Sequence, residues 1–186
     1  MIKLQCYNVK EWTMYSESMR VVLREYNTKD INNLNILFNE KSVREYGEYL
    51  PNDMESIEDH IMLISKDSDS DIRKHFKYII ELKDGQFIGV VGYSYVEEYI
   101  YELEYFLLEK YWNQGYATEA VKQIFDLAKE NNGKVKTIFA ICQTDNKSSE
   151  RVMIKSGMKK SIEQPKPKEY NGVYKERIKY ELDFKA

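Results

Sequence analysis

Alternating hydrophobic and polar residues fill three consecutive stretches in the middle of the chain, which is the period of half-buried β-strands. The stretches run from Phe76 to Lys83, from Gln86 to Val96 and from Tyr99 to Leu108, and Asp84-Gly85 between the first two is a strong signal for a tight hairpin. A shorter strand is predicted from Met19 to Glu25. The middle of the chain is therefore predicted to form an antiparallel meander.

Hydrophobic residues recur at helical spacing in three other segments. Two of these segments, Lys29 to Asn39 with Thr28 as N-cap and Ser56 to Lys66, follow the first strand. The Asp- and Ser-rich run 66–71 behind them predicts a loop. The strongest helical pattern covers Tyr116 to Asn131 and places its hydrophobic residues on one face.

In the last third of the chain, segments with the alternating pattern of strands follow segments with the spacing of helices. Val135 to Cys142 is predicted as a buried strand and Ser148 to Ser156 as a helix, while Met158 to Glu163 and Tyr174 to Phe184 are predicted as strands. This alternation predicts a mixed α/β domain. We expect a single domain over residues 19–186, preceded by an N-terminal extension, residues 1–18, that shows no clear period.

Composition narrows the class of protein. The 186 residues are 42% hydrophobic and 32% charged, which suits one globular domain with a sizeable core. A formal net charge of -3 gives no reason to expect nucleic acid or an anionic membrane as a partner. Two Cys and two His are too few for a disulfide framework or a Cys/His metal cage, and no segment has the pattern of a signal peptide or membrane helix. We therefore expect a cytoplasmic protein that uses no metal.

A tight turn joins the third strand of the meander to the strongest helix. It reads Tyr111-Trp112-Asn113-Gln114-Gly115-Tyr116-Ala117-Thr118-Glu119-Ala120. The first N–H groups of a helix lack partners within the helix, and the helix dipole favours negative charge there, so the turn suits a pyrophosphate. Gly115 allows a close approach of the backbone. Taken alone, one glycine before a helix also fits an ordinary turn.

A second element follows the strand 135–142. It reads Asn146-x-x-Ser149 at the start of a helix that ends with Gly157-Met158. Together with Tyr-Trp-x-x-Gly-Tyr-Ala-Thr-Glu-Ala in the turn, it resembles the Gcn5-related N-acetyltransferase (GNAT) family, and within it the RimJ/RimL-type ribosomal-protein acetyltransferases. The resemblance implies a GNAT-like mixed α/β fold, with a largely antiparallel twisted sheet of about seven strands, splayed fourth and fifth strands, and helices on both faces.

The resemblance also implies how acetyl-CoA is bound. The end of the fourth strand should offer backbone groups to the pantetheine arm, through Phe106, Leu107 and Leu108. The turn should hold the pyrophosphate with the main-chain N–H groups of Gln114, Gly115, Tyr116, Ala117 and Thr118. Asn146 should bond the pantetheine, and a plain helix N-cap is an equally good interpretation of it. Trp112 stands where the family usually has Gln or Arg, so a side-chain contact to phosphate is missing there.

Transfer of an acetyl group to an amine needs a base and stabilisation of the oxyanion and the departing thiolate. We predict Glu104 as the base, because on the alternating strand it shares a face with Glu102 and Phe106, close to the expected position of the thioester. The alternative is that Glu102 and Glu104 form a solvated acidic face that only attracts a cationic substrate.

The proton donor of many family members is a Tyr four residues before the glycine that closes the last helix, and Met153 occupies that position here. Ser149, where Rim-type proteins also carry Ser, is predicted to hydrogen-bond the thiolate or to relay a proton to it. A plain first-turn serine is one alternative for Ser149, and supply of the proton by Tyr174 is another.

The acceptor is not fixed by these motifs. The Rim-type resemblance implies a protein N-terminal amine, but polyamine and aminoglycoside acetyltransferases share the cofactor half. The segments Lys41 to Leu50 and Lys166 to Tyr174 are predicted to wall the acceptor cleft, in a monomer or a homodimer. Two rivals are a non-catalytic acyl-CoA-binding regulatory module and a hydrolase built on Cys142, although a thiol in an apolar strand is usually inert.

Overall fold

The computed structural model describes residues 19–47, 49–68, 73–130, 135–170 and 172–184. The predicted extension, residues 1–18, lies outside this range. The strands are β1 (Val21–Glu25), β2 (His75–Leu82), β3 (Phe87–Glu97), β4 (Ile100–Leu107), β5 (Thr137–Gln143), β6 (Lys159–Lys160), β7 (Lys168–Tyr170), β8 (Val173–Lys175) and β9 (Arg177–Asp183). The helices are η1 (Thr28–Asp30), α2 (Ile31–Asn39), α3 (Lys41–Arg44), α4 (Met54–Ser68), η2 (Glu109–Tyr111), α5 (Tyr116–Glu130) and α6 (Lys147–Lys155).

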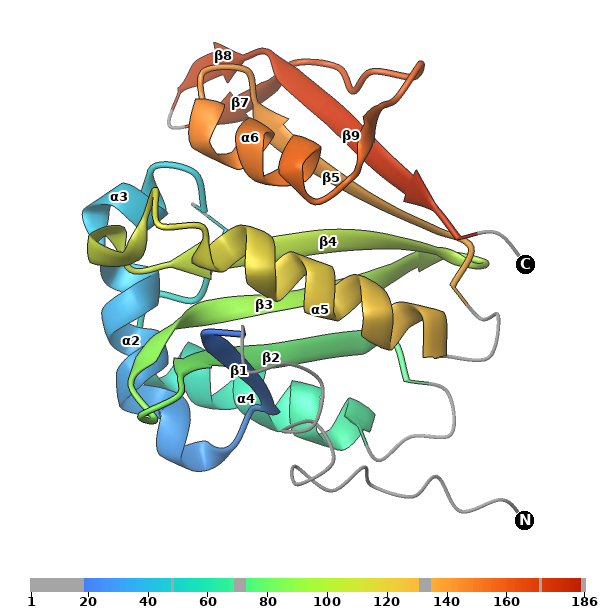
Figure 1. The fold of residues 1–186 in the computed structure, drawn as a ribbon. Helices are drawn as coiled ribbons and strands as arrows, with labels where there is room; N and C mark the ends of the chain where they lie inside the picture. The colour runs from blue at the N-terminus through green and yellow to red at the C-terminus, as the bar shows by residue number, and fades with distance from the viewer. Residues whose placement is uncertain (1–18, 48, 69–72, 131–134, 171, 185–186) are drawn as a thin grey trace.

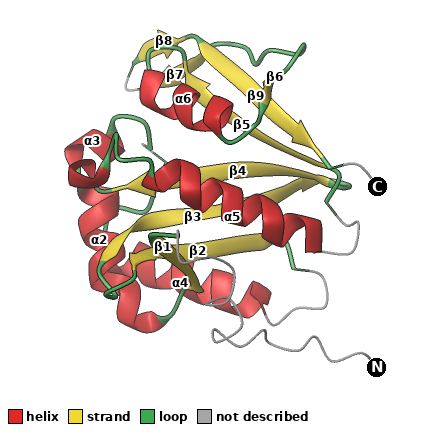
Figure 2. Ribbon diagram, in the orientation of Figure 1, coloured by secondary structure: helices red, strands yellow, loops and turns green. Residues whose placement is uncertain are grey.

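Seven strands form one sheet in the order β1-β2-β3-β4-β5-β9-β6, and β7 pairs with β8 in a separate hairpin. All neighbours in the large sheet are antiparallel except β4 and β5, which are parallel. Helix α5 crosses one face of β1 to β4, while α2 and α4 pack on the other face, and α6 packs beside β5 (Figures 1 and 2). The predicted GNAT-like mixed α/β fold, with its largely antiparallel sheet and helices on both faces, is confirmed.

Hydrophobic runs in the central strands feed two separate cores, one on each face of the sheet. Ile80 and Val91 pack towards α5, whereas their chain neighbours Ile79 and Val90 pack towards α2 and α4. Successive side chains of a strand point to opposite faces, so a strand covered by helices on both sides must be hydrophobic at consecutive positions. These two layers fix the strands on which the site is built.

The structure differs from the sequence prediction mainly at element ends. The predicted N-cap Thr28 is wrong, because the Asn27 side chain caps a 3-10 turn ahead of α2. Helix α4 extends to Ser68, so the predicted loop begins later. The predicted strand 158–163 is only the pair Lys159–Lys160, and the predicted strand 174–184 is broken into β8 and β9. The short helix α3 was not predicted, because its hydrophobic pattern is too short to show a period.

The sheet divides between β4 and β5. These strands are joined at only three register positions, Ile100 with Thr137, Tyr101 with Ile138 and Glu102 with Phe139. Beyond them β4 stays paired with β3 as far as Leu107, while β5 continues along β9 (Figure 1). The predicted splaying of the fourth and fifth strands is confirmed, and each strand presents an unpaired backbone edge to the other.

Candidate active site

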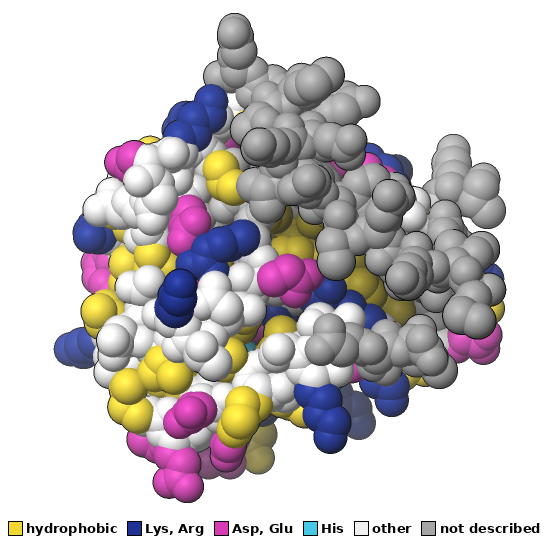
Figure 3. Space-filling view, turned by 90° about the horizontal axis from the view of Figure 1, so that it is seen from below, with side chains coloured by type: hydrophobic (Ala, Val, Ile, Leu, Met, Phe, Trp, Pro, Cys, Tyr) yellow, Lys and Arg dark blue, Asp and Glu magenta, His cyan; other side chains and the backbone are white. Residues whose placement is uncertain are grey.

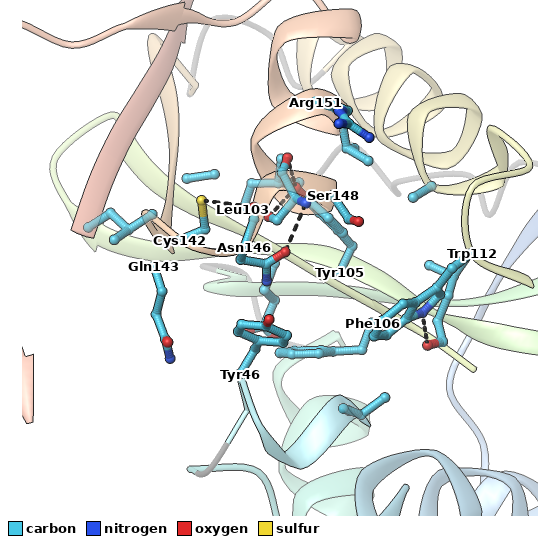
Figure 4. Close-up of a pocket in the computed structure, with 18 of the residues that line it drawn as sticks. Tyr46, Leu103, Tyr105, Phe106, Trp112, Cys142, Gln143, Asn146, Ser148 and Arg151 are labelled. Carbon is cyan, nitrogen blue, oxygen red and sulfur yellow. Dashed lines mark hydrogen bonds between the residues drawn. The ribbon is translucent and has the colours of Figure 1, made fainter. Parts of the chain in front are cut away.

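A cavity of about 760 Å³ opens where β4 and β5 separate, a size typical of small-molecule sites. Its lining comes from β4, β5, β7, the turn before α5, the start of α6 and the α3 segment, and Figure 4 shows part of it. Nine of the residues predicted from sequence line it together: Glu104, Phe106, Leu107, Gly115, Tyr116, Ala117, Thr118, Asn146 and Ser149. Leu108 and Gln114 were also predicted but are not among the lining residues.

The turn before α5 presents backbone N–H groups to this cavity. The first bond of the helix runs from Glu119 N to Gly115 O at 3.0 Å, so the N–H groups of the first three helical residues have no carbonyl within the helix. Gly115 has φ +86°, a value that L side chains rarely adopt. The positive end of the helix dipole also lies here, so these groups are suited to bind an anion.

A brace that the sequence motifs did not reveal holds this turn. The Glu119 carboxylate accepts hydrogen bonds from Arg20 Nε at 3.1 Å and from Val21 N at 2.9 Å, and thereby ties α5 to the start of β1. Arg20 Nη1 donates to Gln114 O at 3.0 Å, and the guanidinium lies 4.5 Å from the centre of the Tyr116 ring. Arg20 stands almost a hundred residues before the turn, so no local pattern could pair them.

The backbone polarity of β4 changes the predicted pantetheine contacts. Leu108 N donates to Ile88 O at 3.0 Å, so the N–H group of Leu108 is already bonded to β3 and is not available to the pantetheine arm. In an antiparallel ladder alternate residues turn their backbone groups to one neighbour, so the backbone groups of Phe106 also point to β3 and those of Tyr105 and Leu107 point into the gap. Leu107 O already accepts a hydrogen bond from the Trp112 indole at 2.7 Å.

The start of α6 forms the opposite wall. Asn146 Oδ1 accepts a hydrogen bond from Ser149 N at 3.0 Å, so its side chain acts as the N-cap of α6. Ser149 Oγ lies 2.7 Å from Tyr105 Oη, which also donates to Ser149 O at 3.0 Å. Burial raises the pKa of Tyr105, which keeps the phenol protonated. Met153 is fully buried in the core, so it offers the cavity neither a proton nor a contact.

Glu104 is held by an ion pair that crosses a glycine. Lys77, Gly92 and Glu104 lie in one row across β2, β3 and β4, and Lys77 Nζ donates to Glu104 Oε1. A Cβ atom on Gly92 would lie 2.8 Å from Lys77 Cδ, so only glycine leaves room for the lysine stem to cross β3. The Lys77 side chain is 5% exposed and Glu104 is 31% exposed, so the carboxylate reaches the cavity while its cation is buried.

A second carboxylate, Glu102, lies on the same face of β4 and also lines the cavity. Burial and the nearby charge of Glu104 raise the pKa of Glu102 above its ordinary value, and Lys77, Arg177 and Lys168 oppose the shift. A carboxyl group with a raised pKa in a cavity is a stronger base than an ordinary one. Glu102 is therefore the competing candidate for the base, and its spacing of two residues from Glu104 was visible in the sequence.

The two segments predicted to wall the acceptor cleft both reach the cavity. Ser42, Val43, Tyr46 and Tyr49 line it from the segment 41–50, and Lys168 and Tyr170 line it from the segment 166–174. Tyr174 is 71% exposed and is not among the lining residues, so the idea that it supplies the proton is not supported.

The described residues around Cys142 do not activate its thiol as a nucleophile. Burial raises its pKa to about 11, so the thiol is uncharged at neutral pH. His75 Nδ1 lies 3.2 Å from Ser94 Oγ, and His60 packs against the rings of Tyr26 and Phe38. Neither histidine is hydrogen-bonded to Cys142, which removes the basis of a cysteine hydrolase.

The described residues contain no cluster of His, Cys, Asp and Glu able to hold a metal ion. Within the same described ranges, no helix is both long and apolar enough to cross a membrane. Figure 3 shows one face of the molecule, on which basic and acidic side chains are interspersed where the described residues are visible.

Comparison with known proteins decides the family. The model of the acetyltransferase (GNAT) domain matches residues 20–159. The chain belongs to the GNAT family. It is 30% identical over 148 residues to YnaD, an uncharacterised N-acetyltransferase of Bacillus subtilis, and the match covers 79% of this chain and 84% of that protein. The protein is therefore an acyl-CoA-dependent acetyltransferase.

Two solved GNAT structures share its fold at low sequence identity. The ribosomal-protein-S5-alanine acetyltransferase of Vibrio fischeri is 18% identical, with a TM-score of 0.76 and coverage of 90% of this chain and 95% of that one. The spermidine N-acetyltransferase of Vibrio cholerae, in complex with CoA and spermine, is 14% identical, with a TM-score of 0.74 and coverage of 88% and 95%. The RimJ/RimL-type resemblance seen in the sequence is thus matched by a structural neighbour of that kind.

Proposed function

We propose that this acetyltransferase moves the acetyl group of acetyl-CoA to a primary amine by direct attack through a tetrahedral intermediate, and that the acceptor is the N-terminal amine of a polypeptide. The observation that carries the proposal is the split between β4 and β5, which joins a backbone anion cradle at one end to a pair of carboxylates at the other. A polyamine or an aminoglycoside is the alternative acceptor, and a spermidine acetyltransferase shares the fold.

Acetyl-CoA would enter along the gap between the strands. The N–H groups at the start of α5 would hold its pyrophosphate, and the gap-facing backbone of Tyr105 and Leu107 would meet the pantetheine arm. Arg151 and Lys155, one turn apart on α6, line the same cavity and supply positive charge for phosphate groups (Figure 4). They compensate for Trp112, whose indole is committed to Leu107 O.

The proposed base is Glu104, with Glu102 as its competitor. The amine nitrogen would attack the thioester carbonyl carbon, lose a proton to the carboxylate, and form the C–N bond of a tetrahedral intermediate whose oxygen holds the negative charge. The C–S bond breaks when this intermediate collapses. Lys77 holds Glu104 Oε1 and leaves the second oxygen for the proton. Because side chains alternate along β4, Glu102 and Glu104 lie on one face, and this pair of carboxylates also attracts a cationic acceptor electrostatically.

The thiolate leaves with the electron pair of the C–S bond, and Ser149 is proposed to hydrogen-bond it. Ser149 Oγ is fixed by Tyr105 Oη at 2.7 Å, and the cap by Asn146 orders the backbone beneath it. The phenol has one proton, so when Tyr105 donates it to Ser149 Oγ instead of to Ser149 O, the serine proton is free to point at the sulfur. A pre-oriented hydroxyl dipole of this kind stabilises developing charge.

We also propose a single domain over residues 19–186, a monomer or homodimer, and a location in the cytoplasm. The described cysteine, Cys142, is a free buried thiol, which suits a reducing compartment.

The test combines calorimetry with acetyl-CoA and an assay of CoASH release. The amine panel contains an alanine-starting peptide, spermidine and an aminoglycoside, with a neutral alcohol as control acceptor. We expect acetyl-CoA to bind and the peptide to release CoASH fastest, with no release from the alcohol. Binding of acetyl-CoA without release from any amine would support the non-catalytic acyl-CoA-binding module instead.

A further inference from the structure

Gln143, the last residue of β5, has a buried amide that lacks a partner. The residue is 4% exposed and lines the cavity, and its Nε2 atom has no hydrogen-bond partner among the described residues. Buried polar groups in folded proteins nearly always have a partner, and one left without a partner destabilises the fold. Because this donor borders a cavity, a ligand can supply the missing acceptor.

A second buried polar atom without a partner belongs to a residue that lines the same cavity. Ser42 Oγ, in α3, is buried and also has no partner within the described ranges. Ser42 and Gln143 lie on elements about a hundred residues apart, so their shared lack of a partner is not a local effect of one turn. Both residues line the cavity, as Tyr46 and Tyr49 do.

The strand pattern places Gln143 on the acceptor side of the gap. Side chains alternate along β5, so Gln143 shares a face with Phe139, and Phe139 pairs in register with Glu102. The opposite face of β5, with Cys142, belongs to the core beneath α5. Figure 4 shows Gln143 extending away from α6 on the side of Tyr46.

We propose that Gln143 Nε2 binds a carbonyl oxygen that neighbours the amine being acetylated. This inference rests on the proposed function and names the acceptor class within it. A peptide N-terminus carries a carbonyl next to its α-amine, whereas a protonated polyamine has N–H donors and methylenes but no acceptor. The subsite therefore selects a peptide over a polyamine, because a polyamine would leave the Gln143 donor without a partner.

The experiment compares two acceptors that differ at the first carbonyl. One is an alanyl-alanine amide, and the other is its analogue with an (E)-alkene in place of the first peptide bond, which lacks the carbonyl oxygen and adds no second amine. For the wild-type enzyme we expect a ratio of kcat/KM of at least about tenfold in favour of the amide. Gln143→Leu should lower kcat/KM for the amide about tenfold, mostly through KM, and leave the analogue unchanged, so that the ratio falls to about one.

Two further variants keep the result interpretable. Gln143→Glu replaces the donor by an acceptor, which should disfavour the amide and so favour the alkene analogue. Gln86→Leu, an exposed glutamine in the β2–β3 turn, should leave the ratio unchanged. Unaltered acetyl-CoA binding by calorimetry verifies that each variant is folded.

The proposal is overturned if Gln143→Leu lowers both acceptors equally, if it lowers neither, or if the wild-type enzyme prefers spermidine or an aminoglycoside to the peptide. In each of these cases release of CoASH still upholds the proposed acetyl transfer. Failure of the wild-type enzyme to acetylate any amine would instead refute the proposed function, and the carbonyl subsite with it.

Discussion

The two ends of the cavity are built on different principles. At the proposed cofactor end one contiguous turn, residues 113–118, supplies backbone groups, with the side chains of Arg151 and Lys155 beside it. The proposed acceptor end is made of side chains from β4, β5 and α3, where Lys77 of β2 holds Glu104. Backbone groups persist when side chains change, so the cofactor end should tolerate most substitutions except those that move the chain. The acceptor end depends on single side chains, and each substitution there removes a specific contact.

The comparison is tested most severely by Glu104→Gln. We expect kcat to fall by about 10²-fold or more, because the amide cannot take the proton of the attacking amine. Its oxygen can still accept the hydrogen bond from Lys77, so the fold should survive. The measurement is the rate of CoASH release at saturating acetyl-CoA and peptide.

The matched control for Glu104→Gln removes the buried cation as well. Lys77→Met with Glu104→Gln should regain any lost stability, since no unpaired charge is left buried, but should not regain turnover. Recovery of turnover in the double variant would mean that Glu104 is structural. If Glu102 were the base instead, Glu102→Gln would lower turnover more than Glu104→Gln does. The wild-type activity would then rise with pH through the raised pKa of Glu102, above the ordinary range of a glutamate.

Gly92→Ala tests whether the acceptor side depends on the space that Gly92 leaves for the Lys77 side chain to reach Glu104 across β3. A Cβ atom there would lie 2.3 Å from Phe76 O, so we expect a loss of about 1–3 kcal/mol in the free energy of unfolding in urea, with reduced turnover. Val96→Ala, at an exposed position of the same strand, should cost under about 0.5 kcal/mol. A Gly92→Ala protein as stable as wild type would show that the absence of a side chain at position 92 is not needed for the Lys77–Glu104 pair.

Gly115→Val tests the cofactor side through its backbone. A β-branched residue strains the positive φ, and its Cβ would lie 3.2 Å from Arg20 Nη2, so KM for acetyl-CoA should rise about tenfold. Thr118→Ala changes a side chain but keeps the N–H group of the cradle, so its KM should stay within about twofold of the wild-type value. Equal effects of the two variants would contradict a backbone-built cradle.

The smallest expected effect comes from Tyr105→Phe, at the junction of the two ends. Loss of the phenol leaves the Ser149 hydroxyl free to rotate, so kcat should fall about fivefold while KM for acetyl-CoA stays constant. Combined with Ser149→Ala, the losses should be strongly non-additive, because both act through one hydrogen bond. Tyr101→Phe, on the same face of β4 but outside the cavity lining, should keep the wild-type rate.

Much of the fold was predictable because its elements have strong local patterns. The meander and α5 were placed within one or two residues, since their hydrophobic periods are long and glycine marks the β2–β3 turn and the turn before α5. The ends failed where contacts outside the segment decide the outcome. Asn27 takes the capping position in place of Thr28, because its N–H donates to the Asp30 carboxylate, which Arg24 of β1 holds in place. The C-terminal strand begins only at Arg177, where pairing with β5 begins.

The sequence by itself determined the turn before α5, the proposed cofactor end, because its consecutive N–H groups and its glycine belong to a single short segment. Only the tertiary structure decided the proposed acceptor end. Lys77 meets Glu104, Tyr105 meets Ser149, and Gln143 enters the cavity because of strand register and of which faces of the split sheet meet. Register and facing are set by the packing of the whole domain, so no local pattern of residues encodes them.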